Sequence, residues 1–148
     1  GWKADSRENF ETALHESRRV AIAVMGGNSV TGQIGMGMPA VRRRRGPVAQ
    51  QFVDRNRQID DGLMSVDFVL GRSASPKESV AFSLHILLMF ATPDCIFLEL
   101  SRPTFAQEGK LVGWSERVLL APLELGGGVT PIDPEDDGDE PPFSVRAK

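Results

Sequence analysis

The amino-acid sequence predicts a mainly β protein of the β-rich α+β class. The expected fold is an antiparallel sandwich or barrel of six to seven short strands with one or two short peripheral helices. Two observations support this: a long apolar run over residues 79–100 alternates with period two, and several shorter apolar runs are separated by turn residues. In addition, the predicted strands are mostly consecutive, so few of them have a helix between them.

The run over residues 79–100 predicts a central hairpin. Between residues 80 and 90 every even position holds a large hydrophobe, whereas the odd positions include small and polar residues. Residues 92–94 (Thr-Pro-Asp) favour a turn, and the alternation resumes over residues 95–100. A three-residue loop would pair Phe90 with Ile96, whereas a one-residue slip would mix the two faces. We therefore expect the Phe90–Ile96 register.

The first third of the chain predicts one helix and one hairpin. Asp5 and Glu8 have the spacing of a capping box, and Phe10 and Leu14 fall on one helical stripe, so residues 5–19 are predicted to be helical. Residues 19–25 alternate as a strand, with a turn at 26–28 and a possible return strand at 30–34.

The remaining elements are predicted from shorter patterns. Pro47 can open a helix over residues 48–59, and residues 63–70 alternate as a strand. Residues 102–110 are predicted to be a loop, followed by short strands at 111–114 and 117–125.

Length and charge divide the chain into two parts. A length of 148 residues predicts one globular β-rich domain over residues 1–125 and a flexible, acidic, Gly- and Pro-containing tail over residues 126–148. The tail has a net charge of −4 and the whole chain −3, so residues 1–125 have a net charge of +1.

A single cysteine, Cys95, excludes an internal disulfide framework and a cysteine-rich zinc site, and predicts an intracellular protein, cytoplasmic or nuclear. No apolar run is long enough for a membrane span.

The most distinctive motif is a run of four arginines between Pro39 and Pro47. Flanking prolines favour an exposed, extended loop, and two more arginines follow within the predicted second helix. Guanidinium groups bind phosphate in a two-pronged geometry, so the run predicts contact with nucleic acid or another polyanion. The candidate binding residues are Arg42, Arg43, Arg44, Arg45, Arg55 and Arg57. Phe52 is the only aromatic residue nearby in the sequence that could stack on a base.

Other interpretations of the arginine run remain open. It could be a nuclear-localisation signal, a protease-cleavage site or a contact for an anionic membrane. It could also be a solvated loop, or an intramolecular partner for the acidic tail.

No other motif predicts chemistry strongly. The glycines at 26–27 and at 35 and 37 lack the spacing of a nucleotide-binding loop and are interpreted as turns. His85, Asp67 and Glu99 form the only acid/base set that the predicted strands bring together. A lone strand histidine is more often structural. We therefore predict no catalytic residue, no metal ligand and no cofactor.

Three functions compete. The first is a non-catalytic assembly or nucleic-acid-associated module that uses the arginine loop. Small viral structural, matrix and movement proteins often combine these features, which is a likeness of composition and not of motif. The second is a protein–protein interaction domain that forms homo-oligomers through sheet edges or an exposed apolar face. The third is a small barrel enzyme that uses His85 with a carboxylate. The sequence favours the first.

Overall fold

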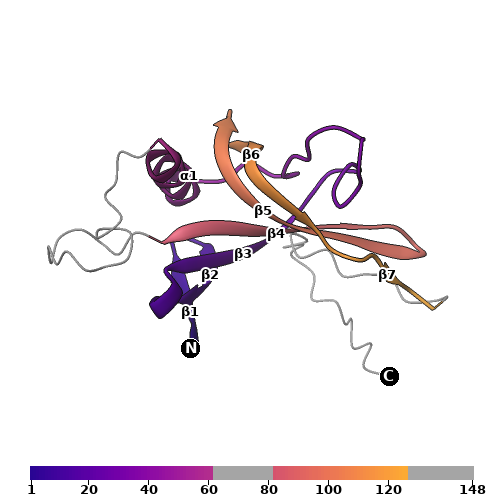
Figure 1. Ribbon diagram of the computed structural model, residues 1–148, viewed down its shortest axis with the longest axis horizontal. Coiled ribbons are helices and arrows are strands. Elements are labelled where there is room, and N and C mark those ends of the chain that lie inside the picture. Colours follow the sequence, from indigo (N-terminus) through magenta and orange to yellow (C-terminus); the bar gives the residue numbers. More distant parts are fainter. Residues whose placement is uncertain (62–81, 127–148) are drawn as a thin grey trace, which may run out of the picture.

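The computed structural model describes residues 1–61 and 82–126, which form one curved sheet with a helix packed against it (Figure 1). The elements in chain order are β1 (Trp2–Arg7), β2 (Phe10–His15), a 3₁₀ turn (Glu16–Arg18), β3 (Val20–Gly26), α1 (Pro47–Asp60), β4 (Ser83–Ala91), β5 (Cys95–Gln107), β6 (Lys110–Leu119) and β7 (Leu123–Glu124).

The strand order is β1-β2-β3-β4-β5-β6, and the short β7 also pairs with β5. Among the strands of residues 1–61 and 82–126, only β3 and β4 pair in parallel, and the connection between them contains α1. The predicted β-rich α+β class is confirmed. The strands form a single sheet that does not close, so within the described residues the architecture is neither a sandwich nor a closed barrel.

The helix predicted over residues 5–19 is wrong, because these residues form the β1–β2 hairpin and the 3₁₀ turn. Glu8 and Asn9 both have positive φ angles, 47° and 63°, as in a two-residue hairpin turn. Phe10 and Leu14 are buried and lie four residues apart, a spacing that fits both a helical stripe and one face of a strand. Buried Thr12 between them shows that the period is two.

The return strand predicted for residues 30–34 is also wrong. This segment forms tight turns, in which the Thr31 N–H donates to the Asn28 carbonyl (3.0 Å). Gly32 has a φ of +69° and lies against the backbone of Leu98, a conformation that an extended strand does not contain. β3 pairs instead with β2 and β4.

The central β4–β5 hairpin is confirmed, but its register is shifted by one residue from the prediction. Phe90 faces Phe97, and Leu88 faces Glu99. The Thr92 N–H donates to the Cys95 carbonyl (2.8 Å), and the Thr92 hydroxyl accepts from the Cys95 N–H (3.1 Å). Thr92 and Cys95 therefore close the hairpin, and only Pro93 and Asp94 remain in the loop.

β5 and β6 are longer than the sequence predicted. Residues 102–107 continue β5 instead of forming a loop, and β6 is one strand across residues 110–119. Glu108 and Gly109, both with positive φ, make the turn between them. Pro103 interrupts the pairing, which shifts between Arg102 and Pro103 and again beyond Pro103.

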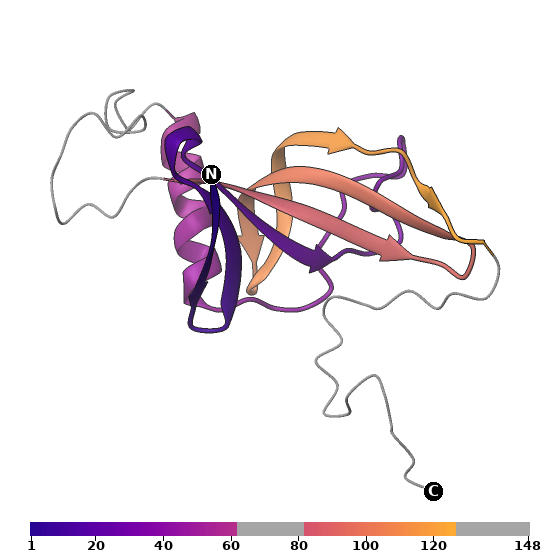
Figure 2. The same cartoon turned by 90° about the horizontal axis from the view of Figure 1, so that it is seen from below.

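The helix predicted over residues 48–59 is confirmed as α1 and covers one face of the sheet. Its buried residues pack with buried residues of β2, β3 and β4, and the Phe10 and Phe52 rings lie 5.7 Å apart. α1 also contacts β5. Figures 1 and 2 show α1 at the end of the sheet that carries β1, and the β4–β5 turn and β7 at the opposite end.

Asn56 joins α1 to the point where β4 and β5 separate. Its side-chain amide donates to the Leu84 carbonyl (3.0 Å) and to the Pro103 carbonyl (2.8 Å), and its oxygen accepts from the Leu84 N–H (3.1 Å). The β4–β5 ladder ends at the pair Ile86 and Ser101. If it continued for two more residues, Leu84 would face Pro103. The Asn56 amide therefore satisfies backbone groups that the separating strands leave open.

The strand predicted for residues 63–70, and the acidic tail from residue 127 onward, lie outside the described residues.

Candidate polyanion-binding site

Backbone hydrogen bonds hold the arginine run against the sheet. The Arg42 N–H donates to the Gly26 carbonyl at the end of β3 (3.0 Å), and the Arg45 N–H donates to the Gly109 carbonyl in the β5–β6 turn (2.7 Å). Arg42, Arg43 and Arg44 have exposed side chains, and that of Arg45 is half-buried. The run is therefore a loop, as predicted, with one end attached to β3 and the other to the β5–β6 turn.

The run leads directly into the N-terminus of α1. Gly46 is the N-cap residue and has no side chain to accept a hydrogen bond, and Pro47 occupies the first turn. The first backbone N–H groups of a helix have no partner within the helix, and the helix dipole makes this end electropositive. The first turn of α1 contains no acidic residue to offset that potential.

The arginines and the helix N-terminus line one hollow of about 280 Å³. Its lining includes Arg43, Arg44 and Arg45, the first residues of α1 and the β1–β2 turn at Glu8 and Asn9. Guanidinium groups and helix N–H groups are both donors that favour phosphate oxygens. Glu8 in the lining, and Glu108 at 3.7 Å from Arg44, reduce the positive potential.

Arg55 and Arg57, the other two predicted site residues, lie about two to three turns further along α1, roughly 12–15 Å from its start. Burial, and secondarily the positive charge of Arg7, lower the pKa of Arg55. Arg57 donates from Nε and Nη2 to the Thr104 carbonyl (3.2 and 3.0 Å). The structure thus places these two arginines on α1 itself, but outside the residues that line the hollow.

Phe105 is a surface aromatic residue that the sequence analysis missed. It is 50% exposed, and the Arg57 guanidinium carbon lies 5.9 Å from its ring centre. Gly113 on β6 makes room for it, because a Cβ there would lie 2.5 Å from the Phe105 Cβ. Phe52, the aromatic expected near the arginines, is buried. Strict alternation along β5 would place Phe105 on the side of the buried Ser101 and Pro103, and it reaches the surface because the β5–β6 register shifts after Pro103. The strand pattern therefore gives no signal for it.

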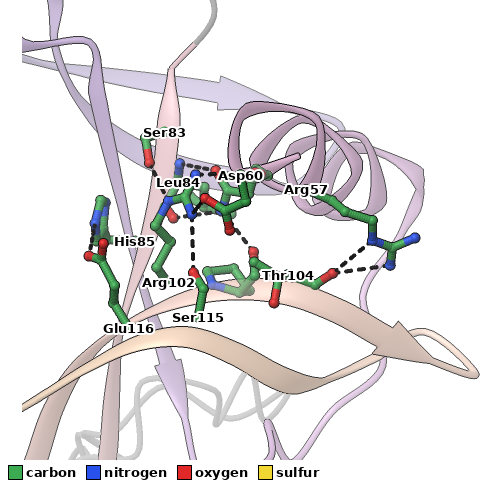
Figure 3. Close-up of polar contacts among 11 residues, drawn as sticks. Arg57, Asp60, Ser83, Leu84, His85, Arg102, Thr104, Ser115 and Glu116 are labelled. Atoms are coloured by element: carbon green, nitrogen blue, oxygen red, sulfur yellow. Dashed lines mark hydrogen bonds and ion pairs between the residues drawn. The ribbon is translucent and has the colours of Figure 1, made fainter. Parts of the chain in front are cut away.

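The acid/base set of His85, Asp67 and Glu99 is not assembled. Asp67 lies outside the described residues, and His85 and Glu99 lie on opposite faces of the sheet because of the shifted register. His85 Nε2 lies 3.9 Å from a carboxylate oxygen of Glu116 instead (Figure 3). Burial, the largest cause, lowers the pKa of His85.

Arg102 lies next to this pair and joins both layers of the fold. It donates to Ser83 Oγ (2.8 Å), Ser115 Oγ (3.1 Å) and the Asn56 carbonyl (3.2 Å), and it pairs with Asp60 near the end of α1 (Figure 3). Its guanidinium is thus already satisfied by protein groups, so Arg102 is a structural residue.

Glu99 is fully buried, which the sequence analysis did not anticipate. Its carboxylate accepts from Arg117 (2.8 and 3.0 Å), from Ser101 Oγ (2.6 Å) and from the Gly32 N–H (2.7 Å). Arg117 also donates to the Gly37 carbonyl (3.2 Å). The ion pair therefore ties the loop between β3 and α1 to β5 and β6.

Residues 1–61 and 82–126 hold no cluster of three or more His, Cys, Asp or Glu side chains suited to a metal ion. None of the helices in these ranges is long and apolar enough to cross a membrane.

Comparison of the chain with protein-family models, with curated proteins and with solved structures gave no match. The arginine hollow and its surroundings are therefore the basis on which a function can be assigned.

Proposed function

We propose that the protein is a non-catalytic module that binds nucleic acid, or a related polyanion, at the hollow formed by Arg43–Arg45 and the N-terminus of α1. The observation that supports this most strongly is that three consecutive arginines and an uncapped helix N-terminus line the same hollow. Two independent sources of positive potential, side-chain charge and backbone dipole, thus favour the same ligand chemistry.

Nucleic acid is preferred over other polyanions because of Phe105 and Arg57. Bases stack on exposed aromatic rings and on guanidinium planes, and this mode of binding suits unpaired strands. Phe105 is on the strand that leads into the β5–β6 turn, and that turn contacts the arginine run through Gly109 and Arg45. Phe105 lies a few residues before that turn along β5. A single strand with a phosphate in the hollow would therefore have a stacking site for a base nearby.

The test is fluorescence anisotropy with a labelled single-stranded oligonucleotide at low salt. The double variant R43S/R44S removes two exposed arginines whose side chains are not needed by the backbone anchors of the loop. We expect it to weaken binding at least tenfold, because each lost charge-assisted contact contributes about 1 kcal/mol or more.

The matched control is K3S/R18S, which removes the same charge from exposed positions outside the hollow. We expect it to bind nearly as the wild type does. Equal weakening by both variants would show that only net charge matters, and would count against a defined site. Absence of binding by the wild-type protein would refute the proposal.

Within this proposal the protein is an assembly or nucleic-acid-associated module, of the general kind found among small viral structural, matrix and movement proteins. Its intracellular location stays a prediction from the sequence. Self-association likewise stays a prediction from the sequence.

A further inference from the structure

Arg57 on α1 is oriented by the backbone of β5. Its Nε and Nη2 both donate to the Thr104 carbonyl, at 3.2 and 3.0 Å. A guanidinium carries five N–H groups in one plane, so these two bonds use one side of the fork and leave the pair at its outer end, on Nη1 and Nη2. Figure 3 shows the third nitrogen pointing away from Thr104. Arg57 therefore presents an oriented pair of donors on an exposed side chain.

The ring of Phe105 lies beside these donors. It is 50% exposed, and the Arg57 guanidinium carbon lies 5.9 Å from its centre. Stacked groups are in contact at about 3.5–4 Å, so at this separation the guanidinium leaves part of the ring open to a further planar group. The ring is also held in place, because its Cβ packs against the backbone of Gly113, where a Cβ would be only 2.5 Å away.

An open ring beside two parallel donors suits a flat ligand with two neighbouring acceptors on one edge. Guanine is such a ligand, because its O6 and N7 accept together from the two prongs of an arginine. Adenine places an amino donor next to its N7, and this donor would face the donors of Arg57. Thymine has a single acceptor, O4, next to its methyl group. Cytosine has two neighbouring acceptors, O2 and N3, but its single ring covers less of Phe105 than a purine does.

We propose that Arg57 and Phe105 form a base-recognition subsite that prefers guanine, with the base stacked on Phe105 and its O6 and N7 bound by Arg57. This inference rests on the proposed function, because a strand must first be held at the arginine hollow. One strand can reach both places. Phe105 is at most about 14 Å along the chain from Gly109, and the Gly109 carbonyl accepts from the Arg45 N–H.

The test is fluorescence anisotropy at low salt with short labelled single strands that alternate thymine with guanine, adenine or cytosine. We expect the guanine strand to bind at least about fivefold more tightly than the other two, because a two-pronged contact discriminates between bases by this factor or more. A strand bound most tightly through adenine or cytosine, or equal binding of all three, would overturn the proposal.

Two guanine analogues identify the edge that is bound. Hypoxanthine keeps O6 and N7 and lacks only the 2-amino group, so a strand that contains it should bind as the guanine strand does. 7-Deazaguanine has a C–H in place of N7 and an almost unchanged shape, so most of the preference should be lost. If 7-deazaguanine binds as tightly as guanine, Arg57 does not contact this edge and the proposal is wrong.

The variant R57K tests the fork separately from the charge. Lysine keeps the positive charge but has no planar pair of donors, so R57K should bind the guanine and adenine strands within about twofold of each other. The matched control is R18K, the same change at an exposed arginine in the 3₁₀ turn, and it should keep the full preference. F105A should weaken binding of both strands, because aromatic stacking contributes to the affinity of every base. A guanine preference that persists in R57K would contradict the assignment.

The variant R43S/R44S separates this inference from the proposed function. It should weaken binding of every strand and leave the ratio of guanine to adenine affinity unchanged, and a ratio that falls to one would show that the hollow reads the base instead. Wild-type protein that binds all strands equally overturns the subsite alone. Wild-type protein that binds none of them refutes the proposed function itself.

Discussion

Glu99 shows how a single carboxylate can organise a loop. It has no exposed surface, and its carboxylate accepts hydrogen bonds from Arg117, Ser101 and the Gly32 N–H. Burial opposes ionisation, but these hydrogen bonds outweigh it, so the pKa of Glu99 lies below its ordinary value. The same hydrogen bond from Arg117 to Glu99 raises the pKa of Arg117.

We expect E99Q to lower the free energy of unfolding by about 3 kcal/mol at pH 7, because Arg117 loses its buried partner. The measurement is urea unfolding, with E116Q as the control at a carboxylate that is 67% exposed. The folded-state pKa of Glu99 is depressed, so its contribution is present above the unfolded value of about 4.3 and lost as the pH falls through the folded value. The difference between wild type and E99Q should therefore shrink on acidification, and a constant difference would contradict this account.

His85 gives a second test at the scale of single residues. Burial lowers its pKa, the charge of Arg102 lowers it further, and Glu116 raises it. We expect NMR to find a titration midpoint below the ordinary 6.5 or so, and a still lower midpoint in E116Q. Because the folded state binds the proton less well, this group costs stability as the pH falls below about 6.5. A midpoint above about 6.5 would contradict the dominance of burial at this site.

At the scale of elements, α1 is joined to the sheet by polar side chains as well as by its apolar face, and Asn56 is the buried one among those on the helix. Asn56 supplies three hydrogen bonds to the backbone of Leu84 and Pro103, at the position where Pro103 has no N–H to offer. The sequence contains no pattern that identifies this role, because it depends on how β4 and β5, both far from Asn56 in the sequence, separate at that point.

We expect N56A to lower the free energy of unfolding by about 2–4 kcal/mol, since it leaves buried backbone groups without partners. Thermal or urea unfolding measures the loss. Q58A, an exposed amide on the same helix, should change stability by less than about 0.5 kcal/mol. Similar small losses for both variants would mean that the strands close the gap themselves.

The elements that the sequence predicted correctly are those with one unambiguous local signal. Pro47 and the following apolar spacing identified α1, and the alternation at residues 80–100 identified β4 and β5. The β1–β2 hairpin was mistaken for a helix because Phe10 and Leu14 satisfy both periods. The β4–β5 register was missed because a buried, charged Glu99 opposite Leu88 makes sense only with Arg117 brought in from β6.

At the scale of the whole molecule, α1 connects the two parts of the proposed binding surface. The arginine hollow lies at the N-terminus of α1, and Arg57 lies about three turns further along the helix, beside Phe105 of β5. The arginines of the hollow could be predicted from the sequence because they are consecutive. Their convergence with a helix N-terminus could not, because it depends on hydrogen bonds to β3 and to the β5–β6 turn.

The most direct test of polyanion binding at the hollow is the salt dependence of oligonucleotide affinity. Each phosphate neutralised on a single strand adds about 0.7 to the slope of log K against log salt concentration. If Arg43 and Arg44 each contact a phosphate, R43S/R44S should reduce the magnitude of the slope by about 1.4, and K3S/R18S should leave it unchanged. A slope that is the same in wild type and R43S/R44S would contradict the assignment of the hollow as the binding site.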